Sequence, residues 1–372
     1  MKPEVLPQRA ATRRSKNKKK KRKGKFRRFV LRLFLVFLLA GIGGAAWLFL
    51  TPSGKDMRYL AADTLITTQH RHWAKYFIGE AEAQKRVAEY SARFEQMGEE
   101  KDRHTINLSD LVPTRMKQPL VEVEEVSGRN YHGYVMTVRD PTKIRLGIPA
   151  KVGRGERVSS MVGRLGAIAG VNGGGFADPN WDGNGFKPIG VVISQGQIYY
   201  NDMGKNASVQ IVGIDKQGKM IAGHYSLSEL SKMNVQEAVT FQPRLIVNGK
   251  GLIRNANEGW GIAPRTAMGQ RADGAIIFVT VDGRQPGYSI GANLYDMQNI
   301  LLKHGAVIGA NLDGGSSTVL VKDRAIINKP SSEYGERYLP TAFLVFEHPE
   351  TVNIPNIWAG LNPEDIDAAK KR

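Results

Sequence analysis

Two aspartates of this 372-residue chain stand in the same local pattern, in which an apolar run ends in Asp and glycine follows. Asp282 closes GAIIFVTVDG (274–283), and Asp313 closes GAVIGANLDGG (305–315). A pair of carboxylates can supply the nucleophile, acid or base of an enzymatic reaction. A single Asp-Gly pair more often marks a turn. Two such pairs, each at the end of a strand, predict a site if the strands end together.

The segment between the two runs predicts how the aspartates are positioned. SIGANLYDMQNILLKHG (289–305) has apolar residues on one helical face, and Gly305 suits a helix end. A strand, a helix and a strand with short joins predict a βαβ unit with parallel strands. The carboxyl ends of parallel strands meet at one edge of the sheet, where ligands bind in open α/β sheets. We therefore expect Asp282 and Asp313 to share that edge.

Other residues of the chain could bind an anion. Asn172 ends a third apolar run, GAIAGVN (166–172), and three glycines come directly after it. Successive glycines expose backbone N–H groups that can form an anion nest. Arg265, in WGIAPRTAMGQ, offers a guanidinium group that matches phosphate with two parallel hydrogen bonds. A single arginine such as Arg265 more often forms a surface salt bridge than a phosphate site. Glu336-Arg337, taken alone, indicates only a charged loop.

Two other chemistries receive less support. Neither a P-loop nor GxGxxG spacing follows the apolar runs, which disfavours nucleotide binding. A serine hydrolase is disfavoured because Thr318 stands where GxSxG needs its second glycine. The candidate bases for such an enzyme lie in no motif; they are His132, His224 and His304. The chain has no cysteine, which excludes disulfides, thiolate metal sites and cysteine nucleophiles.

Two alternatives remain open beside a hydrolase. One is a non-catalytic module that binds an anionic glycopolymer in the same pocket. The other is a phosphodiesterase that uses a divalent cation such as Mg²⁺ or Ca²⁺, although clustered histidines are absent. Its oxygen ligands would be Asp282 and Asp313 with Asp178 or Asp182.

The N-terminal region predicts a membrane anchor. Residues 33–50 contain no charge, and with the apolar residues from Phe29 they are long enough to cross a bilayer. Residues 1–28 carry a net charge of +13 out of +18 for the chain. Basic residues beside a membrane span stay in the cytoplasm, so residues 51–372 are expected outside the cell. A cleaved signal peptide is the alternative. Residues 16–50 are thus expected to contact anionic lipid, and nucleic acid is not an expected partner.

The remaining pattern predicts an α+β (mixed α/β) fold, whose largely buried mixed sheet contains the parallel βαβ unit. Helical spacing of apolar residues over 59–100 predicts a stalk or a helix packed on the domain. Short apolar runs broken by glycine predict strands from Leu120 onward. The expected parts are a basic tail (1–28), a transmembrane helix (29–50), a helical stalk and linker (51–119), a catalytic domain (120–347) and a C-terminal tail (348–372).

Five blocks, in their order, resemble the phosphodiester glycosidase family, many of whose bacterial members are described as exopolysaccharide biosynthesis proteins. These blocks are NGGGF, PRTAMG, VDGRQPGYSIG, NLDGGSSTVL and ERYLPTAFLV. The resemblance covers about residues 120–347 and depends on all five blocks together. It departs from the family pattern at Gly175, and at Ser316, where the family often has a third glycine.

The resemblance implies hydrolysis of a sugar-1-phosphodiester at the anomeric carbon, on a cell-surface glycopolymer or exopolysaccharide. It implies catalytic roles for Asp313, as nucleophile or as base for water, and for Asp282 and Arg265. Arg265 and glycine N–H groups would stabilise charge on the departing phosphate. The implied substrate-binding residues are Asn172, Gly173, Gly174, Gly175, Gly283, Gly314, Gly315, Ser317, Glu336 and Arg337. No cofactor is required by this chemistry, and a divalent cation remains the alternative.

Overall fold

The computed structural model describes residues 9–68, 70–106, 118–179, 184–204 and 207–370, so part of the predicted linker and Asp182 lie outside the described residues. Contacts divide the chain into two units, Met1–Ala61 and Ala62–Arg372. The helix α2 (Pro52–Ile66) begins in the first unit and ends in the second.

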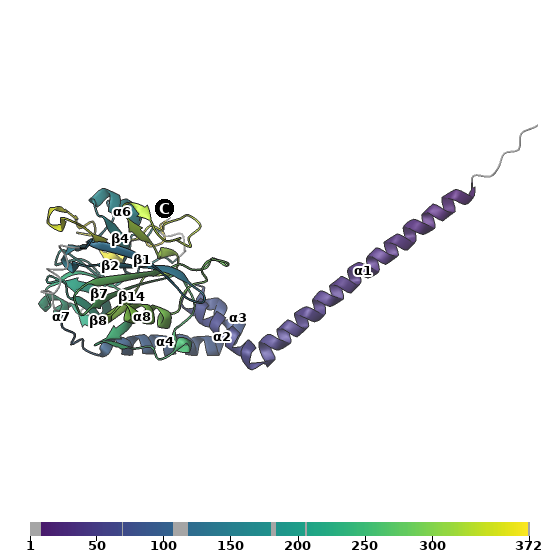
Figure 1. Ribbon diagram of the computed structural model, residues 1–372, viewed down its shortest axis with the longest axis horizontal. Helices are drawn as coiled ribbons and strands as arrows, with labels where there is room; N and C mark the ends of the chain where they lie inside the picture. The colour runs from purple at the N-terminus through teal and green to yellow at the C-terminus, as the bar shows by residue number, and fades with distance from the viewer. Residues whose placement is uncertain (1–8, 69, 107–117, 180–183, 205–206, 371–372) are drawn as a thin grey trace, which may run out of the picture. The chain divides into compact units, whose positions relative to one another are not determined.

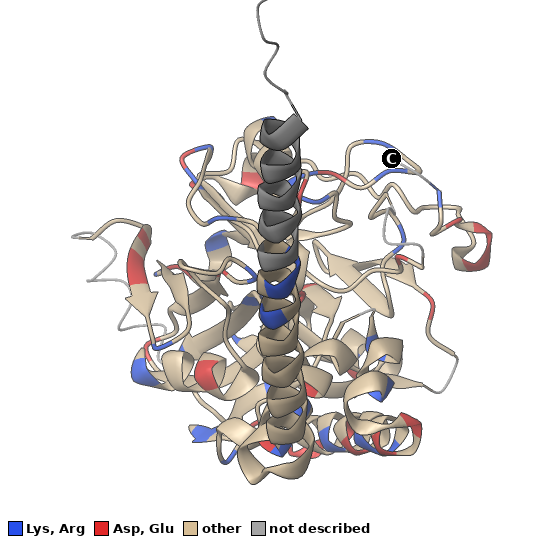
Figure 2. Cartoon of the chain, turned by 90° about the vertical axis from the view of Figure 1, so that its right-hand side faces the viewer, with Lys and Arg blue, Asp and Glu red and all other residues tan. Residues whose placement is uncertain are grey.

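The smaller unit is dominated by the helix α1 (Arg9–Leu50) (Figure 1). Its portion Phe26–Leu50 is long and apolar enough to cross a membrane, a test that a signal sequence also passes. In Figure 2, the part of α1 drawn in colour has basic residues near its N-terminal end and no charged residue along the rest of the helix. The helix also includes the basic residues from Arg9 onward. Lys and Arg are good helix formers, so they can extend a helix that the apolar segment stabilises.

The predicted helical region 59–100 is confirmed, and its part from Ala62 onward belongs to the larger unit. It contains the end of α2, the short helices η1 (Arg71–Ala74) and α3 (Lys75–Ile78), and α4 (Glu80–Glu99). Arg86 on α4 donates to Asp63 on α2 at 2.6 Å. Phe94 on α4 meets the ring of Trp260 edge-on at 4.6 Å between centroids. From Ala62 onward, these helices are therefore fastened to the sheets of the larger unit.

Three antiparallel sheets form the body of the larger unit. In spatial order, the seven-stranded sheet contains β1 (Val121–Ser127), β2 (His132–Val138), β13 (Ile276–Val281), β12 (Arg265–Arg271), β14 (Ala306–Leu312), β10 (Arg244–Val247) and β11 (Lys250–Gly251). The second contains β16 (Ala325–Ile326), β15 (Leu320–Lys322), β4 (Ala169–Asn172), β17 (Ala342–Val345) and β3 (Ile144–Gly147). The third contains β6 (Gln197–Asn201), β5 (Val191–Ser194), β9 (Val235–Thr240), β7 (Ser208–Asp215) and β8 (Met220–Ser226).

Short helices connect or cover these strands. They are α6 (Val158–Leu165), α7 (Leu227–Lys232), α8 (Leu294–Lys303), η3 (Pro141–Lys143), η4 (Ala256–Glu258), η5 (Gly315–Ser317), η6 (Pro349–Thr351) and η7 (Pro363–Asp365). The predicted C-terminal tail also packs on the body, because Trp358 is buried and its indole N–H donates to the carbonyl of Phe186 at 3.1 Å.

The apolar runs at 166–172, 274–283 and 305–315 contain strands, as predicted, but the mixed sheet with a parallel βαβ unit is wrong. The helix α8 joins β13 to β14, yet β12 lies between these strands and pairs antiparallel with both. The strands therefore point in the same direction without pairing, and Asp282 and Asp313 still follow the same end of the sheet. Continuous apolar strands suggested a helix-covered parallel sheet. Here their faces are buried between sheets and under α8.

One large core cluster unites the three sheets. It contains Phe278 and Met268 from the first sheet, Phe343 from the second, and Val192 and Val212 from the third. The rings of Phe278 and Phe343 lie 5.7 Å apart between centroids. A second cluster packs α8 on the other face of the seven-stranded sheet. The strand ends, and the loops that leave them, are thus held by packing on both faces.

Candidate active site

A cavity of about 260 Å³ lies at the end of the seven-stranded sheet where β12 begins and β14 ends. All three sheets supply residues to it, since Phe176 follows β4 and Phe241 follows β9. Among the described residues that line the cavity, Asp313 is the only carboxylate. Four arginines line it as well, namely Arg71, Arg265, Arg284 and Arg337. The lining therefore suits an anion that is bound beside one carboxylate.

Asp313 is held firmly while one of its oxygens stays free. Its Oδ1 accepts from the backbone N–H of Gly314 at 2.9 Å. Its Oδ2 is buried and has no hydrogen-bond partner among the described residues. Burial raises the pKa of Asp313 to about 6, against the lowering effects of the Ser317 side chain, of Arg337 and of the Gly314 N–H. At neutral pH the group is thus mostly ionised and remains basic enough to accept a proton.

Arg265 is buried without a carboxylate partner in the described part of the chain. Its Nη2 donates to the carbonyl of Trp260 at 2.8 Å, and its Nε donates to that of Ala292 at 3.4 Å. Burial, with a smaller effect of the neighbouring Arg284, lowers the pKa of Arg265 to about 10. The guanidinium group therefore stays charged at neutral pH and lacks a compensating negative charge.

Arg337 and Arg284 complete the inner part of the lining. Arg337 forms a buried ion pair with Asp178, and its Nη1 donates to the Oγ of Ser316 at 3.3 Å. The serine that departs from the family pattern is thus a partner of this arginine. The guanidinium of Arg284 lies over Gly315, where an added Cβ would come within 3.1 Å of its Nη2. Glycine also suits the positive φ of 61° at position 315.

Asp282 is not among the residues that line the cavity. It is 1% exposed, and its Oδ1 accepts from Asn328 Nδ2 at 2.8 Å and from the Lys329 N–H at 3.0 Å. Its Oδ2 accepts from the hydroxyl of Tyr288 at 3.0 Å. The structure therefore gives Asp282 a role in holding the segment at 328–329, and its predicted catalytic role gains no support from this geometry. Gly283 packs against Pro264 instead of lining the cavity.

The predicted anion nest after Asn172 is wrong, because its N–H groups are already bonded within the protein. Gly173 N–H donates to the carbonyl of Thr341 at 3.0 Å, and Gly174 N–H donates to the Thr341 hydroxyl at 3.0 Å. Gly175 N–H donates to the carbonyl of Thr240 at 3.2 Å. A Cβ at Gly173 would lie 2.5 Å from the Thr341 hydroxyl, and one at Gly174 would lie 2.7 Å from the Cβ of Val239, so close packing requires these glycines.

Of three other predicted substrate-binding residues, the structure places two outside the cavity and one in its lining. Asn172 is buried outside the cavity and positions Asp313, since its Nδ2 donates to the Asp313 carbonyl at 2.5 Å. Glu336 accepts from the N–H of Ser159 at 2.9 Å, in the first turn of α6, and is not in the lining. Ser317 does line the cavity, together with Gly314 and Gly315.

Several lining residues were not selected from the sequence. Asn311 precedes Asp313 by two positions, so both side chains leave the same face of the strand. Its Nδ2 donates to the carbonyl of Gln242 at 3.1 Å, whereas its buried Oδ1 has no partner in the described part of the chain. Strand alternation could have identified Asn311. The sequence signal for Arg284 was its place in the block VDGRQPG. No signal in the sequence indicated that Arg71 lines the cavity.

The described donors do not fit the alternative metal site. No group of three or more His, Cys, Asp or Glu residues that could hold a metal ion occurs among the described residues. Asp178 is paired with Arg337, and both oxygens of Asp282 accept hydrogen bonds from the protein. The histidines considered as bases, His132, His224 and His304, do not line the cavity around Asp313 either.

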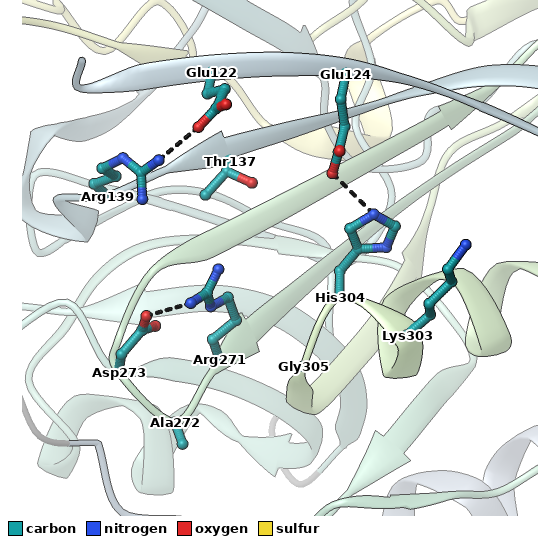
Figure 3. Close-up of a pocket in the computed structure, with 10 residues that line it drawn as sticks. All are labelled: Glu122, Glu124, Thr137, Arg139, Arg271, Ala272, Asp273, Lys303, His304 and Gly305. Carbon is teal, nitrogen blue, oxygen red and sulfur yellow. Dashed lines mark hydrogen bonds and ion pairs between the residues drawn. The ribbon is translucent and has the colours of Figure 1, made fainter. Parts of the chain in front are cut away.

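A larger cavity of about 670 Å³ lies at the opposite end of the seven-stranded sheet (Figure 3). Most of its charged residues are already paired. Glu122 bonds with Arg139 at 2.5 Å, and His304 lies 2.9 Å from Glu124. Arg271 is also paired, with Asp273. The smaller cavity is the better candidate because it combines unpaired arginine with an unpartnered carboxylate oxygen.

Comparisons with known proteins connect this geometry to a family. Residues 165–346 match the phosphodiester glycosidase family. The chain is 37% identical over 70 residues to the N-acetylglucosamine-1-phosphodiester alpha-N-acetylglucosaminidase of Bos taurus, covering 19% of this chain and 13% of that protein. It is 26% identical over 219 residues to the SPbeta prophage-derived protein YomE of Bacillus subtilis (strain 168), covering 57% of this chain and 32% of the relative. The chain thus matches about a third or less of either relative's length.

The fold has a counterpart among solved structures. The catalytic domain of zebrafish N-acetylglucosamine-1-phosphodiester alpha-N-acetylglucosaminidase, described as auto-inhibited by its pro-peptide, aligns with a TM-score of 0.52 and 20% identity. The alignment covers 66% of this chain and 88% of that one. At this identity the likeness shows the fold alone, and the matched residues carry the assignment. Residues 165–346 therefore form a domain of the phosphodiester glycosidase family, a family of hydrolases, as the sequence blocks predict.

Proposed function

We propose that this protein hydrolyses a sugar-1-phosphodiester at the anomeric carbon, with the phosphate among the arginines and the sugar beside Asp313. One observation carries the proposal: the only carboxylate in the described cavity lining has a buried, unpartnered oxygen in a site otherwise rich in arginine. The family match supports it. The bovine and zebrafish relatives are named for removal of N-acetylglucosamine from a phosphodiester, which makes that sugar the first to test.

The arginines account for recognition of the diester. Arg265 has no carboxylate partner, and Arg284 has no side-chain hydrogen bond or ion pair among the described residues. A phosphodiester supplies the missing negative charge, and guanidinium groups match its oxygens. When the bond to the anomeric carbon breaks, charge grows on the phosphate. Fixed cations in a partly desolvated cavity stabilise that charge, which is the usual source of a large rate effect.

Asp313 would act as the base for water in a single displacement. Water loses a proton to the free Oδ2 and forms the new bond to the anomeric carbon, while the carbon–oxygen bond to phosphate breaks. A phosphate monoester leaves more readily than an alkoxide, so the reaction needs little help from a general acid. This explains how one carboxylate suffices where glycosidases usually use two. Asp282 then serves as a positioning residue outside the cavity. A single displacement inverts the anomeric configuration.

The setting of the reaction is also proposed. The uncharged part of α1 and the basic residues before it support a single membrane span with a cytoplasmic N-terminus and an extracellular catalytic domain. The substrate would then be a phosphodiester-linked glycan at the cell surface, such as a glycopolymer or exopolysaccharide. Protease treatment of intact cells tests this arrangement. Digestion of the larger unit supports it, and complete protection contradicts it.

The reaction is tested with the detergent-solubilised full chain and two substrates, the methyl phosphodiester of N-acetylglucosamine-1-phosphate and UDP-N-acetylglucosamine. Wild type should release reducing sugar in multiple turnovers, and Asp313→Asn should lose at least about a thousandfold in kcat. Asp323→Asn is a matched control, because its carboxylate is exposed and lies outside the cavity lining. Near-full activity of Asp313→Asn contradicts the assignment.

Two other outcomes would select the alternatives. Products of phosphorus–oxygen cleavage, without reducing sugar, would favour a phosphodiesterase. Calorimetric binding without any turnover would favour a glycopolymer-binding module. Proton NMR of the first-formed sugar reports whether the anomeric configuration is inverted, and retention would make Asp313 the nucleophile instead.

A further inference from the structure

The segment that follows α2 contributes directly to the candidate active site. Thr67, Thr68 and Arg71 line the same cavity as Asp313 and Arg265. These three residues lie outside the part of the chain that matches the family, which begins at residue 165. The cavity is therefore completed by a segment that this chain places between its apolar N-terminal helix and the family domain.

The segment is fixed in place by the loop that also orients Arg265. Ile262 N–H donates to the Oγ1 of Thr64 at 3.1 Å. Gly261 packs so closely that an added Cβ would lie 2.5 Å from the Cα of Thr64, and its φ is 67°. The carbonyls of Trp260 and Gly261 accept from Arg265. The position of the segment and the orientation of the buried arginine are thus set together.

Within this segment, Arg71 is the group that can bind an additional anion. The hydroxyl of Thr67 donates to the carbonyl of Thr64 at 3.0 Å, and that of Thr68 donates to Leu65 at 2.8 Å. Both hydroxyl protons are therefore already used. Arg71 is exposed at the cavity, and no hydrogen bond or ion pair of its guanidinium group occurs among the described residues. Its side chain remains available to a ligand.

The balance of charged side chains in the inner cavity indicates how many anionic groups that ligand carries. The inner cavity is lined by the guanidinium groups of Arg265, Arg284 and Arg337 and by the carboxylate of Asp313, while Asp178 pairs with Arg337. This leaves one positive charge, which the scissile phosphodiester neutralises. Arg71 is then in excess, and a cation at the mouth of a cavity attracts a second negative group.

We propose that Arg71 is a specificity-determining residue that contacts a second anionic group of the substrate, adjacent to the scissile diester. This inference rests on the proposed function and deepens it. The substrate class becomes a sugar joined through a pyrophosphate, or through a phosphodiester with a neighbouring phosphate. Arg71 contributes to binding and leaves the reacting bond to Asp313 and Arg265.

The test is calorimetry on the detergent-solubilised full chain with inorganic pyrophosphate and with methyl phosphate. Arg71→Gln should weaken pyrophosphate binding about tenfold and methyl phosphate binding less than about twofold, because only the second anionic group loses a contact. Arg71→Lys should restore part of the lost affinity. Lys75→Gln is the matched control, since Lys75 is a nearby cation that is absent from the cavity lining.

Equal weakening of both ligands, no weakening of either, or no pyrophosphate binding by wild type would overturn the proposal. These outcomes do not depend on turnover, so they are separate from a failure of the proposed reaction. If the reaction occurs, Arg71→Gln should raise KM for UDP-N-acetylglucosamine about tenfold, with kcat and the KM of the methyl phosphodiester unchanged.

Discussion

The side-chain amide of Asn172 donates a 2.5 Å hydrogen bond to the backbone carbonyl of Asp313 and thereby joins two sheets at the candidate active site. The Oδ1 of Asn172 accepts from the Thr266 hydroxyl at 2.8 Å and from the Val319 N–H at 3.1 Å. One fully buried amide thus satisfies three groups that come from distant parts of the sequence. Asp313 can be held in one orientation because its backbone is fixed from the neighbouring sheet.

Replacement of this amide should damage both the fold and the site. Asn172→Ala leaves the Asp313 carbonyl, the Thr266 hydroxyl and the Val319 N–H without this partner in a buried place. A loss of about 2–4 kcal/mol in the free energy of unfolding is expected, since each such group costs about 1–3 kcal/mol. Urea unfolding measures the loss. Unchanged stability would show that the three groups find other partners.

The pH dependence of turnover should report Asp313. Its carboxylate must be ionised to take a proton from water, and burial raises its pKa to about 6. The value of kcat/KM should therefore fall tenfold per pH unit below about pH 6 and level off above it. Initial rates between pH 4 and pH 8 measure this limb. A flat profile through pH 5 would exclude Asp313 as the base.

The same carboxylate should reduce the stability of the fold at neutral pH. Its pKa is higher in the folded state than the ordinary value of 3.8, so folding favours its protonated form. The stabilisation is present below pH 3.8 and is lost as the pH rises through about 6. Asp313→Asn should thus be more stable than wild type by on the order of 1–2 kcal/mol at pH 7.5, with little difference at pH 4.

Thermal unfolding of both proteins at the two pH values measures that difference. The exposed Asp323→Asn variant should show no such pH-dependent gain. A loss of stability in Asp313→Asn at pH 7.5 would contradict the direction of the pKa change.

Asp282→Asn should separate positioning from catalysis. The carboxylate accepts from Asn328, from the Lys329 N–H and from Tyr288, and an amide nitrogen cannot accept in the same way. We expect a loss of about 1–3 kcal/mol in stability. The effect on kcat should stay below about tenfold, because the residue does not line the cavity. A kcat as low as that of Asp313→Asn would assign Asp282 a direct role in the reaction.

The sequence predicted where helices and strands lie along the chain better than it predicted which strands pair with one another. The helix α8 (Leu294–Lys303) lies within the segment 289–305 that was expected to be helical, and the side chain of Asn293 caps it by accepting from the N–H of Asp296 in a capping box. Such signals are local, within a few residues of the chain. The place of β12 between β13 and β14 is a long-range choice that apolar periodicity does not encode. The predicted parallel pair failed for that reason.

The residues of the candidate site also divide into those that local sequence indicates and those that depend on long-range contacts. Asp313 and Arg265 were found because each lies in a block of unusual composition. The three glycines after Asn172 were assigned to an anion nest because the acceptors of their N–H groups, near Thr240 and Thr341, are distant in sequence. Arg71 could not be selected, since its segment reads as a helical stalk and only the folded chain brings it to the cavity.

The excess of guanidinium groups in the cavity has a thermodynamic consequence for the empty protein. Burial lowers the pKa of Arg265, and repulsion from Arg284 lowers it further; neither arginine has a carboxylate partner among the described residues. Any small anion that enters relieves this repulsion and binds only the folded chain. Folding stability is therefore linked to the anion content of the surroundings, and it rises with the logarithm of anion concentration once the site begins to fill.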